Sequence, residues 1–250
     1  MSYQNPNELK EKIAAYWDTR AEEFVQSRQL EFVPEKRARW IKECSVLTKP
    51  FTGLDVLDVG TGTGFLAILL SEEGAHCQGI DLSPQMITQA RATAKAHGQA
   101  ISFYIGSADD TPFEPESFDL IVTRNLTWTL PDAHQAYQHW FNLLKPEGVL
   151  INFDAAYGPV SFEALTKELE DEGTLNAHCG MDEARLKLCD AIKAELAISH
   201  VERPAWDEST LKSIGFSTVS VDKTVSERLY PEHDLTWNPV PLFKIVARKG

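Results

Sequence analysis

The feature that most constrains the fold is a regular alternation of short apolar runs and helical patterns between residues 55 and 153. The runs that we expect to form strands are 55–59, 76–80, 101–105, 119–123 and 149–153. Residues 132–145 instead carry apolar side chains at helical spacing. Strands that alternate with helices indicate a parallel sheet covered on both faces. The pattern therefore predicts an α/β protein.

The segments on either side of this core are mostly helical. We expect one domain over residues 1–250, with N-terminal lid helices at 8–48 (8–30 and 35–48) and a helical insertion at 158–205. A short helix at 207–214 is expected to end at Gly215. Two last strands, 216–221 and 242–248, complete the predicted sheet.

The first expected strand ends in a glycine-rich turn, Asp58-Val59-Gly60-Thr61-Gly62-Thr63-Gly64. Glycines allow a sharp turn and a close approach of a ligand to the backbone. Open α/β sheets bind ligands at the carboxyl ends of their strands. The turn thus predicts a ligand site, although a loop of this kind by itself occurs in many nucleotide-binding proteins.

Carboxylates follow the next two expected strands. Asp81 ends the second one, where a carboxylate can accept hydrogen bonds from ribose hydroxyls. The alternative role, capping the helix that follows, is better filled by Ser83. Asp109 follows the third strand and could accept from an adenine amino group, whereas Asp110 fits a polar turn equally well.

Together these segments resemble the class I S-adenosylmethionine-dependent methyltransferases. The matching stretches are residues 56–64, Ile80-Asp81-Leu82-Ser83-Pro84-Gln85-Met86, Ala108-Asp109, residues 118–122 and Leu143-Leu144-Lys145-Pro146-Glu147-Gly148-Val149-Leu150. The resemblance implies a Rossmann-like, doubly wound sheet of seven strands in the order 3-2-1-4-5-7-6, with the seventh antiparallel.

The resemblance also implies the cofactor, S-adenosylmethionine, and its binding residues. The three glycines of the turn would line its methionine and ribose parts, and Asp81 would hold both ribose hydroxyls. Leu82 or Met86 would lie against the adenine, and an aromatic residue and an arginine of the first helix would close over it. The full set is Asp58, Gly60, Thr61, Gly62, Gly64, Asp81, Leu82, Met86, Ala108, Asp109, Arg124, Asn125, Tyr16 and Arg20.

The implied reaction is transfer of a methyl group to a small-molecule acceptor, mainly by positioning the two molecules in line. No catalytic base is identified. The segment Arg124–Asp132 lacks the Asn/Asp-Pro-Pro-Tyr/Phe pattern, and Trp128 stands near the position of the histidine in plant-type O-methyltransferases. Asp154, at the end of the fifth strand, could face the substrate. Aromatic side chains favour a partly apolar acceptor: Phe162, Trp206, Tyr230 and Trp237.

Two alternatives stay open. A nicotinamide-dependent oxidoreductase is disfavoured, because its fingerprint is G-x-G-x-x-G whereas this loop is G-x-G-x-G. A protein that binds S-adenosylmethionine without turnover has the same sequence features, and only turnover with an acceptor would separate it from an enzyme.

Composition indicates which partners and which cellular compartment to expect for the protein. The net charge of −13 disfavours a nucleic-acid partner. No apolar run is long enough for a membrane span, and Met1–Pro6 does not resemble a secretory signal. Four widely spaced cysteines fit a reducing, cytoplasmic setting. His178, Cys179 and His200 match no metal motif, so we expect no metal; the oligomeric state is left open.

Overall fold

Seven strands form one sheet in the computed structural model, which describes residues 6–176 and 181–250. Their order is β3-β2-β1-β4-β5-β7-β6. The first five are parallel, and β7 runs antiparallel to both of its neighbours. The predicted order and the antiparallel last strand are confirmed. The bounds are β1 Asp55–Val59, β2 His76–Asp81, β3 Ser102–Ile105, β4 Phe118–Arg124, β5 Leu144–Ala155, β6 Thr218–Asp222 and β7 Leu242–Arg248.

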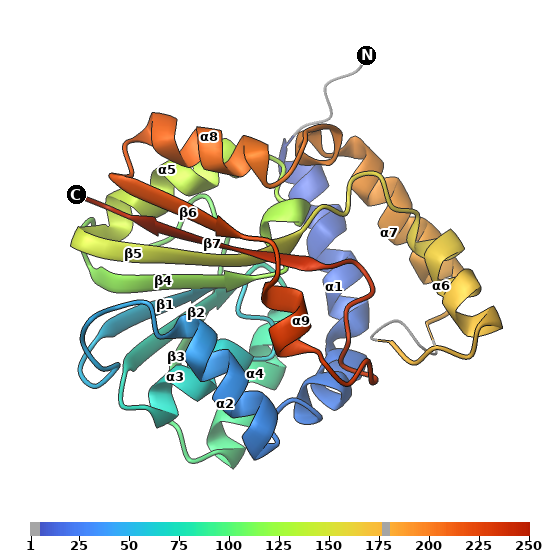
Figure 1. Cartoon of the computed structure of the whole chain (residues 1–250), viewed down its shortest axis with the longest axis horizontal. Coiled ribbons are helices and arrows are strands. Elements are labelled where there is room, and N and C mark those ends of the chain that lie inside the picture. Colours follow the sequence, from blue (N-terminus) through green and yellow to red (C-terminus); the bar gives the residue numbers. More distant parts are fainter. Residues whose placement is uncertain (1–5, 177–180) are drawn as a thin grey trace.

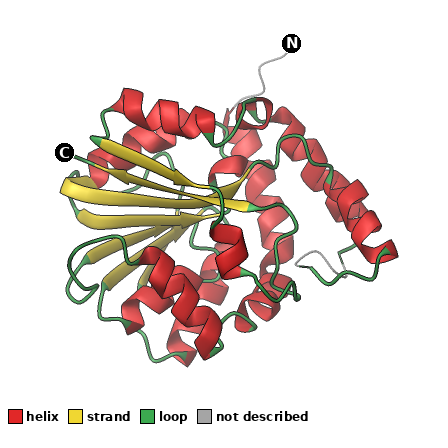
Figure 2. Ribbon diagram, viewed as in Figure 1, coloured by secondary structure: helices red, strands yellow, loops and turns green. Residues whose placement is uncertain are grey.

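Helices cover both faces of the sheet (Figures 1 and 2). Helices α5 and α8 lie on one face, and α2 and α3 on the other (Figure 1). Because both faces are covered, successive residues of β1 (56–59) and of β4 (120–123) are buried, rather than every second one. The bounds are α1 Pro6–Gln29, α2 Pro34–Cys44, α3 Phe65–Glu72, α4 Pro84–Ala96, α5 Ala133–Leu143, α6 Phe162–Asp171, α7 Glu183–Glu195, α8 Ala205–Ile214 and α9 Val225–Leu229, with short 3-10 helices η1 Thr127–Thr129 and η2 Ala197–His200.

Local signals set several helix ends. Ser83 accepts a hydrogen bond from the amide of Met86 and begins α4 in the predicted manner. Asp132 accepts from the amide of Gln135 at the start of α5. Gly215 ends α8 in the left-handed conformation, at a φ of 119°. The caps at Ser83 and Gly215 confirm the sequence-based assignments, whereas the cap at Asp132 was not predicted.

Two parts of the fold differ from the expectations. Residues 145–148, between the expected helix at 132–145 and the expected strand at 149–153, lie within β5, which begins at Leu144 and pairs there with Phe118. The register then shifts, so that Val149 pairs with Leu120. Glu147 takes a positive φ of 61° at this irregularity, a backbone conformation that is typical of turns. The connection between the last two expected strands also contains a helix that was not predicted, α9, whose five residues are too few for a clear helical pattern.

Helix α1 crosses the carboxyl ends of the parallel strands, and α6 and α7 lie beyond it (Figure 1). Lys12 of α1 forms an ion pair with Glu195 of α7 at 2.9 Å. Arg185 of α7 forms another with Glu23 of α1. Helix α7 of the predicted insertion therefore packs on α1, and residues 177–180 of the insertion lie outside the described part.

No helix within residues 6–176 and 181–250 is long and apolar enough to cross a membrane. The expectation about a secretory signal concerns residues 1–5 in large part, which lie outside the described chain. His178 and Cys179 lie outside it as well.

Candidate active site

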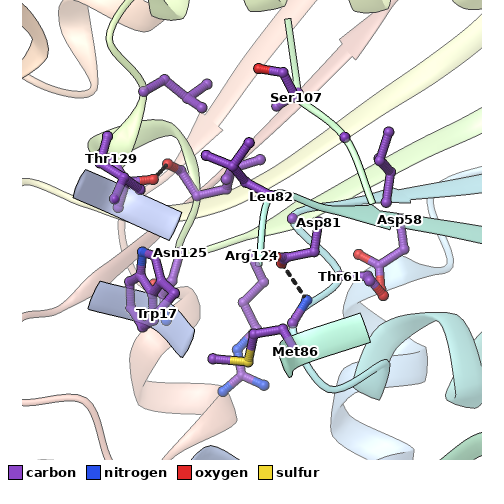
Figure 3. A pocket seen from close by; sticks show the side chains of 18 of the residues that line it. Trp17, Asp58, Thr61, Asp81, Leu82, Met86, Ser107, Arg124, Asn125 and Thr129 are labelled. Atoms are coloured by element: carbon purple, nitrogen blue, oxygen red, sulfur yellow. Dashed lines mark hydrogen bonds between the residues drawn. The ribbon is translucent and has the colours of Figure 1, made fainter. Parts of the chain in front are cut away.

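A pocket opens at the carboxyl ends of β1 to β4, beneath α1 (Figure 3). We call it the strand-end pocket. It brings together eleven of the fourteen residues that the sequence marked: Asp58, Gly60, Thr61, Gly62, Asp81, Leu82, Met86, Ala108, Asp109, Arg124 and Asn125. Residues as far apart in the chain as Asp58 and Asn125 thus share one wall, because parallel strands end at one edge.

The glycine-rich turn needs glycine for two separate reasons. Gly60 and Gly62 have φ values of 66° and 54°, a region that other residues rarely adopt. A Cβ on Gly60 would lie 2.7 Å from Leu126. A Cβ on Gly62 would have no atom within 4 Å, because this backbone borders open space. The turn is therefore shaped to let a ligand approach its backbone.

Asp58 ties the turn to the following helix. Its carboxylate accepts hydrogen bonds from the Thr61 hydroxyl at 2.7 Å and from the Ala67 amide at 3.0 Å. The side chain is buried, and burial raises the pKa of Asp58 to about 7, against the effect of both hydrogen bonds. Asp58 thus fixes the loop geometry from within the pocket wall.

Asp81 presents its carboxylate at the centre of the strand-end pocket (Figure 3). One oxygen accepts from the Gly62 amide and the other from the Ser83 amide, each at 2.9 Å. A carboxylate oxygen can accept more than one hydrogen bond, so both keep capacity for a ligand. Burial raises the pKa of Asp81 to about 6, despite these amide donors.

The far end of the pocket is formed by the turn after β3. Asp109 pairs with Lys10 of α1 at 2.7 Å, and Ser107 also donates to it. Although burial opposes it, these donors hold the pKa of Asp109 below its ordinary value. The carbonyl of Ala108 accepts from the Trp140 indole at 2.7 Å, which anchors the turn on α5.

Arg124 and Asn125 close the other end, after β4. The Arg124 guanidinium lies 2.9 Å from Glu31 and 4.1 Å from the centre of the Trp40 ring. Asn125 takes a positive φ of 54°, and its side-chain oxygen accepts from the Tyr157 hydroxyl at 3.0 Å. Both residues also line a second cavity, described below.

Three predicted residues lie outside the lining of the strand-end pocket: Gly64, Tyr16 and Arg20. A Cβ on Gly64 would lie 3.2 Å from Phe103, so this glycine allows α3 to pack closely. Tyr16 and Arg20 face the second cavity instead, where Arg20 donates to the Tyr16 hydroxyl at 2.9 Å.

The second cavity, which we call the aromatic cavity, has a volume of about 540 Å³. It lies between α1, η1, the insertion and the segment after α9. The aromatic residues of its wall are Tyr16, Trp17, Phe24, Trp128, Tyr157, Phe162 and Tyr230. Phe162 and Tyr230 were expected near a substrate; Trp206 and Trp237, expected there too, are not part of the lining.

Five residues line both spaces and so mark where they meet: Trp17, Phe24, Arg28, Arg124 and Asn125. Trp17, Phe24 and Arg28 were missed as site residues, because on an amphipathic helix an apolar stripe predicts packing and nothing more. Only the position of α1 across the strand ends places them here (Figure 3 shows Trp17).

Asp154 does not face either space. It is fully buried, accepts from the Trp128 amide at 2.9 Å and pairs with Arg203 at 3.1 Å. Arg203 also pairs with Asp207 at 2.8 Å. The expectation that Asp154 could meet a substrate is therefore wrong, because an arginine remote in sequence covers it.

Metal binding has no candidate centre in the described part of the chain. Within residues 6–176 and 181–250, no three His, Cys, Asp or Glu side chains are grouped so as to hold an ion. Of the three residues considered from sequence, only His200 is described, and its ring lies 3.1 Å from the Ala194 carbonyl.

The strand order, the glycine turn after β1 and the carboxylate after β2 are those of the class I methyltransferase fold. Comparison with known proteins agrees with this fold. Residues 56–148 match the model of a family described as a methyltransferase domain. The resemblance to class I methyltransferases predicted from sequence is confirmed over this stretch.

Individual relatives share this core rather than their whole length. A ubiquinone biosynthesis O-methyltransferase of Xylella fastidiosa is 36% identical over 102 residues, which are 40% of this chain and 42% of the relative. The chain thus spans less than half of that protein.

Solved structures share the fold. The YcgJ protein of Bacillus subtilis is 18% identical with a TM-score of 0.54, over 86% of this chain and 97% of that one. Phosphoethanolamine N-methyltransferase 2 of Haemonchus contortus, solved with S-adenosyl-L-methionine, has a TM-score of 0.57 at 18% identity, over 84% and 52% respectively.

Proposed function

We propose that the protein is an enzyme that transfers a methyl group from S-adenosylmethionine to a small-molecule acceptor. The observation that carries the proposal is the strand-end pocket, which gathers eleven predicted cofactor residues, all within the stretch that matches a methyltransferase domain. The open space above Gly62 and the spare acceptor capacity of Asp81 fit a nucleoside with two ribose hydroxyls.

The pocket residues have separate roles in this proposal. Asp81 accepts from the ribose hydroxyls, Leu82 and Met86 pack on the adenine, and Ala108 and Asp109 border its edge. The glycine turn, held by Asp58 and Thr61, faces the methionine part, with Arg124 and Asn125 opposite. Gly64 supports the turn, and Tyr16 and Arg20 act from the α1 side, on the acceptor.

S-adenosylmethionine supplies a methyl group on a cationic sulfur, and the new bond to the acceptor forms as the carbon–sulfur bond breaks. What the chain must do is hold the acceptor in line and exclude water. The aromatic cavity adjoins the strand-end pocket at Trp17 and Asn125, so an acceptor seated there approaches from one side. Its volume of about 540 Å³ suits a small molecule.

The setting of the reaction is part of the proposal. Cys44, Cys77 and Cys189 are buried free thiols, which suits a reducing, cytoplasmic compartment. The net charge of −13 disfavours nucleic acid as the acceptor.

The test is calorimetry with S-adenosylmethionine, followed by screening of small acceptors for release of S-adenosylhomocysteine. We expect micromolar binding, about −8 kcal/mol, and release that depends on an acceptor. Binding without release for any acceptor would favour a non-catalytic binding protein. Tight binding of NADH, with no binding of S-adenosylmethionine and no release of S-adenosylhomocysteine, would overturn the proposal.

A further inference from the structure

Arg20 of α1 is a nearly buried arginine in the wall of the aromatic cavity, with a side chain that is only 9% exposed. Its Nη1 donates to the Tyr16 hydroxyl at 2.9 Å, and its Nε donates to Glu23 at 3.2 Å. The guanidinium carbon lies 5.9 Å from the centre of the Tyr16 ring and 5.8 Å from that of Phe24. The two hydrogen bonds and the two rings fix the position of the charged group.

One nitrogen of this guanidinium remains available to a ligand. Nη2 carries two N–H donors, and no described residue accepts a hydrogen bond from it. Protein atoms do not enclose it, in contrast to Nε and Nη1 of Arg124, which are both buried and unpaired. Because Arg20 lines the aromatic cavity, its free donors are open to a molecule in that cavity. A nearly buried charge with unused donors indicates a position for an anion.

The charge of the cavity wall supports the same conclusion. The chain as a whole has a net charge of −13. The charged residues among the described lining are nevertheless three arginines and one glutamate: Arg20, Arg28, Arg124 and Glu23. Glu23 is 45% exposed and is shared between Arg20 and Arg185, so it balances Arg20 only in part. A positive wall in an acidic protein favours an anionic ligand and disfavours a cationic one.

Aromatic rings form much of the remaining wall. The ring centres of Trp128, Tyr157 and Phe162 lie 4.8, 5.6 and 5.5 Å apart. Phe24 lines both spaces and lies one helical turn from Arg20, so about 5–6 Å of α1 separate the guanidinium from the junction with the strand-end pocket. A flat ring can pack on these side chains while an acidic group at one end reaches Arg20 and the other end faces the strand-end pocket.

We propose that Arg20 binds the carboxylate of an aromatic acid, and that this acid is the methyl acceptor. The inference rests on the proposed function and adds the chemical class of the substrate. Arginine N–H groups form strong, charge-assisted hydrogen bonds with carboxylates. A singly charged carboxylate fits better than a doubly charged phosphate, because Glu23 lies beside the same guanidinium and would repel the second charge.

Calorimetry with three aromatic acids and their methyl esters tests the site. The acids are 4-hydroxybenzoate, 4-hydroxyphenylacetate and 4-hydroxycinnamate, which differ in the distance between ring and carboxylate. Each acid and each ester is measured with and without S-adenosylhomocysteine. We expect wild type to bind at least one acid about tenfold or more tightly than its ester. Arg20→Met should abolish this preference, while its affinities for the ester and for S-adenosylhomocysteine stay within about twofold of wild type.

Comparing acid and ester on the same protein separates the contact from general effects of the substitution on folding. Arg20→Lys keeps the charge and should retain part of the preference. Arg185→Met is the matched control and should retain all of it, because Arg185 pairs with the same Glu23 but does not line the cavity.

Two results would overturn the inference: a wild type that prefers none of the three acids to its ester, or a preference that survives in Arg20→Met. A wild type that binds neither S-adenosylmethionine nor S-adenosylhomocysteine would instead contradict the proposed function, whichever of the aromatic ligands it binds.

Discussion

At the scale of single residues, Asp81 shows how one carboxylate can organise a loop and remain available to a ligand. Its carboxylate accepts hydrogen bonds from the backbone amides of Gly62 and Ser83, and it still faces the strand-end pocket. The cap of α4 is left to Ser83. That Ser83 rather than Asp81 caps the helix was predictable, because Ser83-Pro84 is a complete signal for the start of a helix.

Asp81→Ala should weaken S-adenosylhomocysteine binding by about 2–4 kcal/mol, since it removes a charged acceptor of two ribose hydrogen bonds. Circular dichroism should still show the wild-type helix content. Asp110→Ala is the matched control: Asp110 is exposed and does not line the pocket. Calorimetry that found equal affinities for the two variants would refute the ribose assignment.

Asp58 and Asp81 also make the stability of the ligand-free protein depend on pH. Burial raises their pKa values to about 7 and about 6, well above the value of roughly 3.9 in an unfolded chain. The folded protein therefore holds protons that the unfolded chain releases, and the free energy of unfolding falls as pH rises from about 4 to about 7.

Asp58→Asn should flatten this dependence, because it removes one of the two titrating groups while keeping a hydrogen-bond acceptor for the Ala67 amide. The measurement is urea unfolding of both proteins between pH 5 and pH 8. The difference in the free energy of unfolding between wild type and variant, taken at each pH, gives the contribution of Asp58 apart from that of other titrating groups. A difference that stays constant across this range would show that the raised pKa of Asp58 is wrong.

At the scale of elements, α1 and the insertion lie where an acceptor must enter. Helix α1 provides Lys10, Ile13, Trp17, Phe24 and Arg28 to the strand-end pocket. Two exposed ion pairs join it to the insertion, Lys12 to Glu195 and Arg185 to Glu23, and buried side chains of the two also meet, Tyr16 beside Cys189. The exposed ion pairs themselves contribute little to stability.

We predict that residues 8–30 and 158–205 form a mobile cover over the acceptor. Methyl transfer gains from excluding water, and yet the acceptor has to enter. Hydrogen exchange measured with and without S-adenosylhomocysteine should show clear protection of both segments on ligand addition, with β4 as an internal control that stays protected. High protection in both states would mean that the two segments are fixed. The acceptor would then have to enter past residues 223–241 instead.

At the scale of the whole molecule, a buried charge network joins the end of the insertion to the sheet. Arg203 lies between Asp154 of β5 and Asp207 of α8, and Tyr137 of α5 donates to Asp207 at 2.7 Å. All four side chains are buried. From this network we propose that the chain forms a single domain.

Arg203→Met should lower the free energy of unfolding by about 3–5 kcal/mol, because two buried carboxylates lose their cationic partner. Wild type and variant should each unfold in one transition in urea, followed by circular dichroism and tryptophan fluorescence. Lys212→Met, at the exposed pair with Glu208, should cost less than about 1 kcal/mol. Separate transitions for the two probes in wild type would contradict the single domain.

The sequence by itself determined the sheet and the strand-end pocket. Each strand and each carboxylate or glycine at a strand end is a local pattern, and parallel strands bring such ends to one edge without further information. The tertiary structure alone decided what lies across that edge. Arg28, Glu31 and Arg124 meet, and Asp154 is covered by Arg203, only because helices remote in sequence pack there. Such contacts depend on the burial and charge of whole surfaces, and these cannot be predicted from the spacing of residues along a short segment.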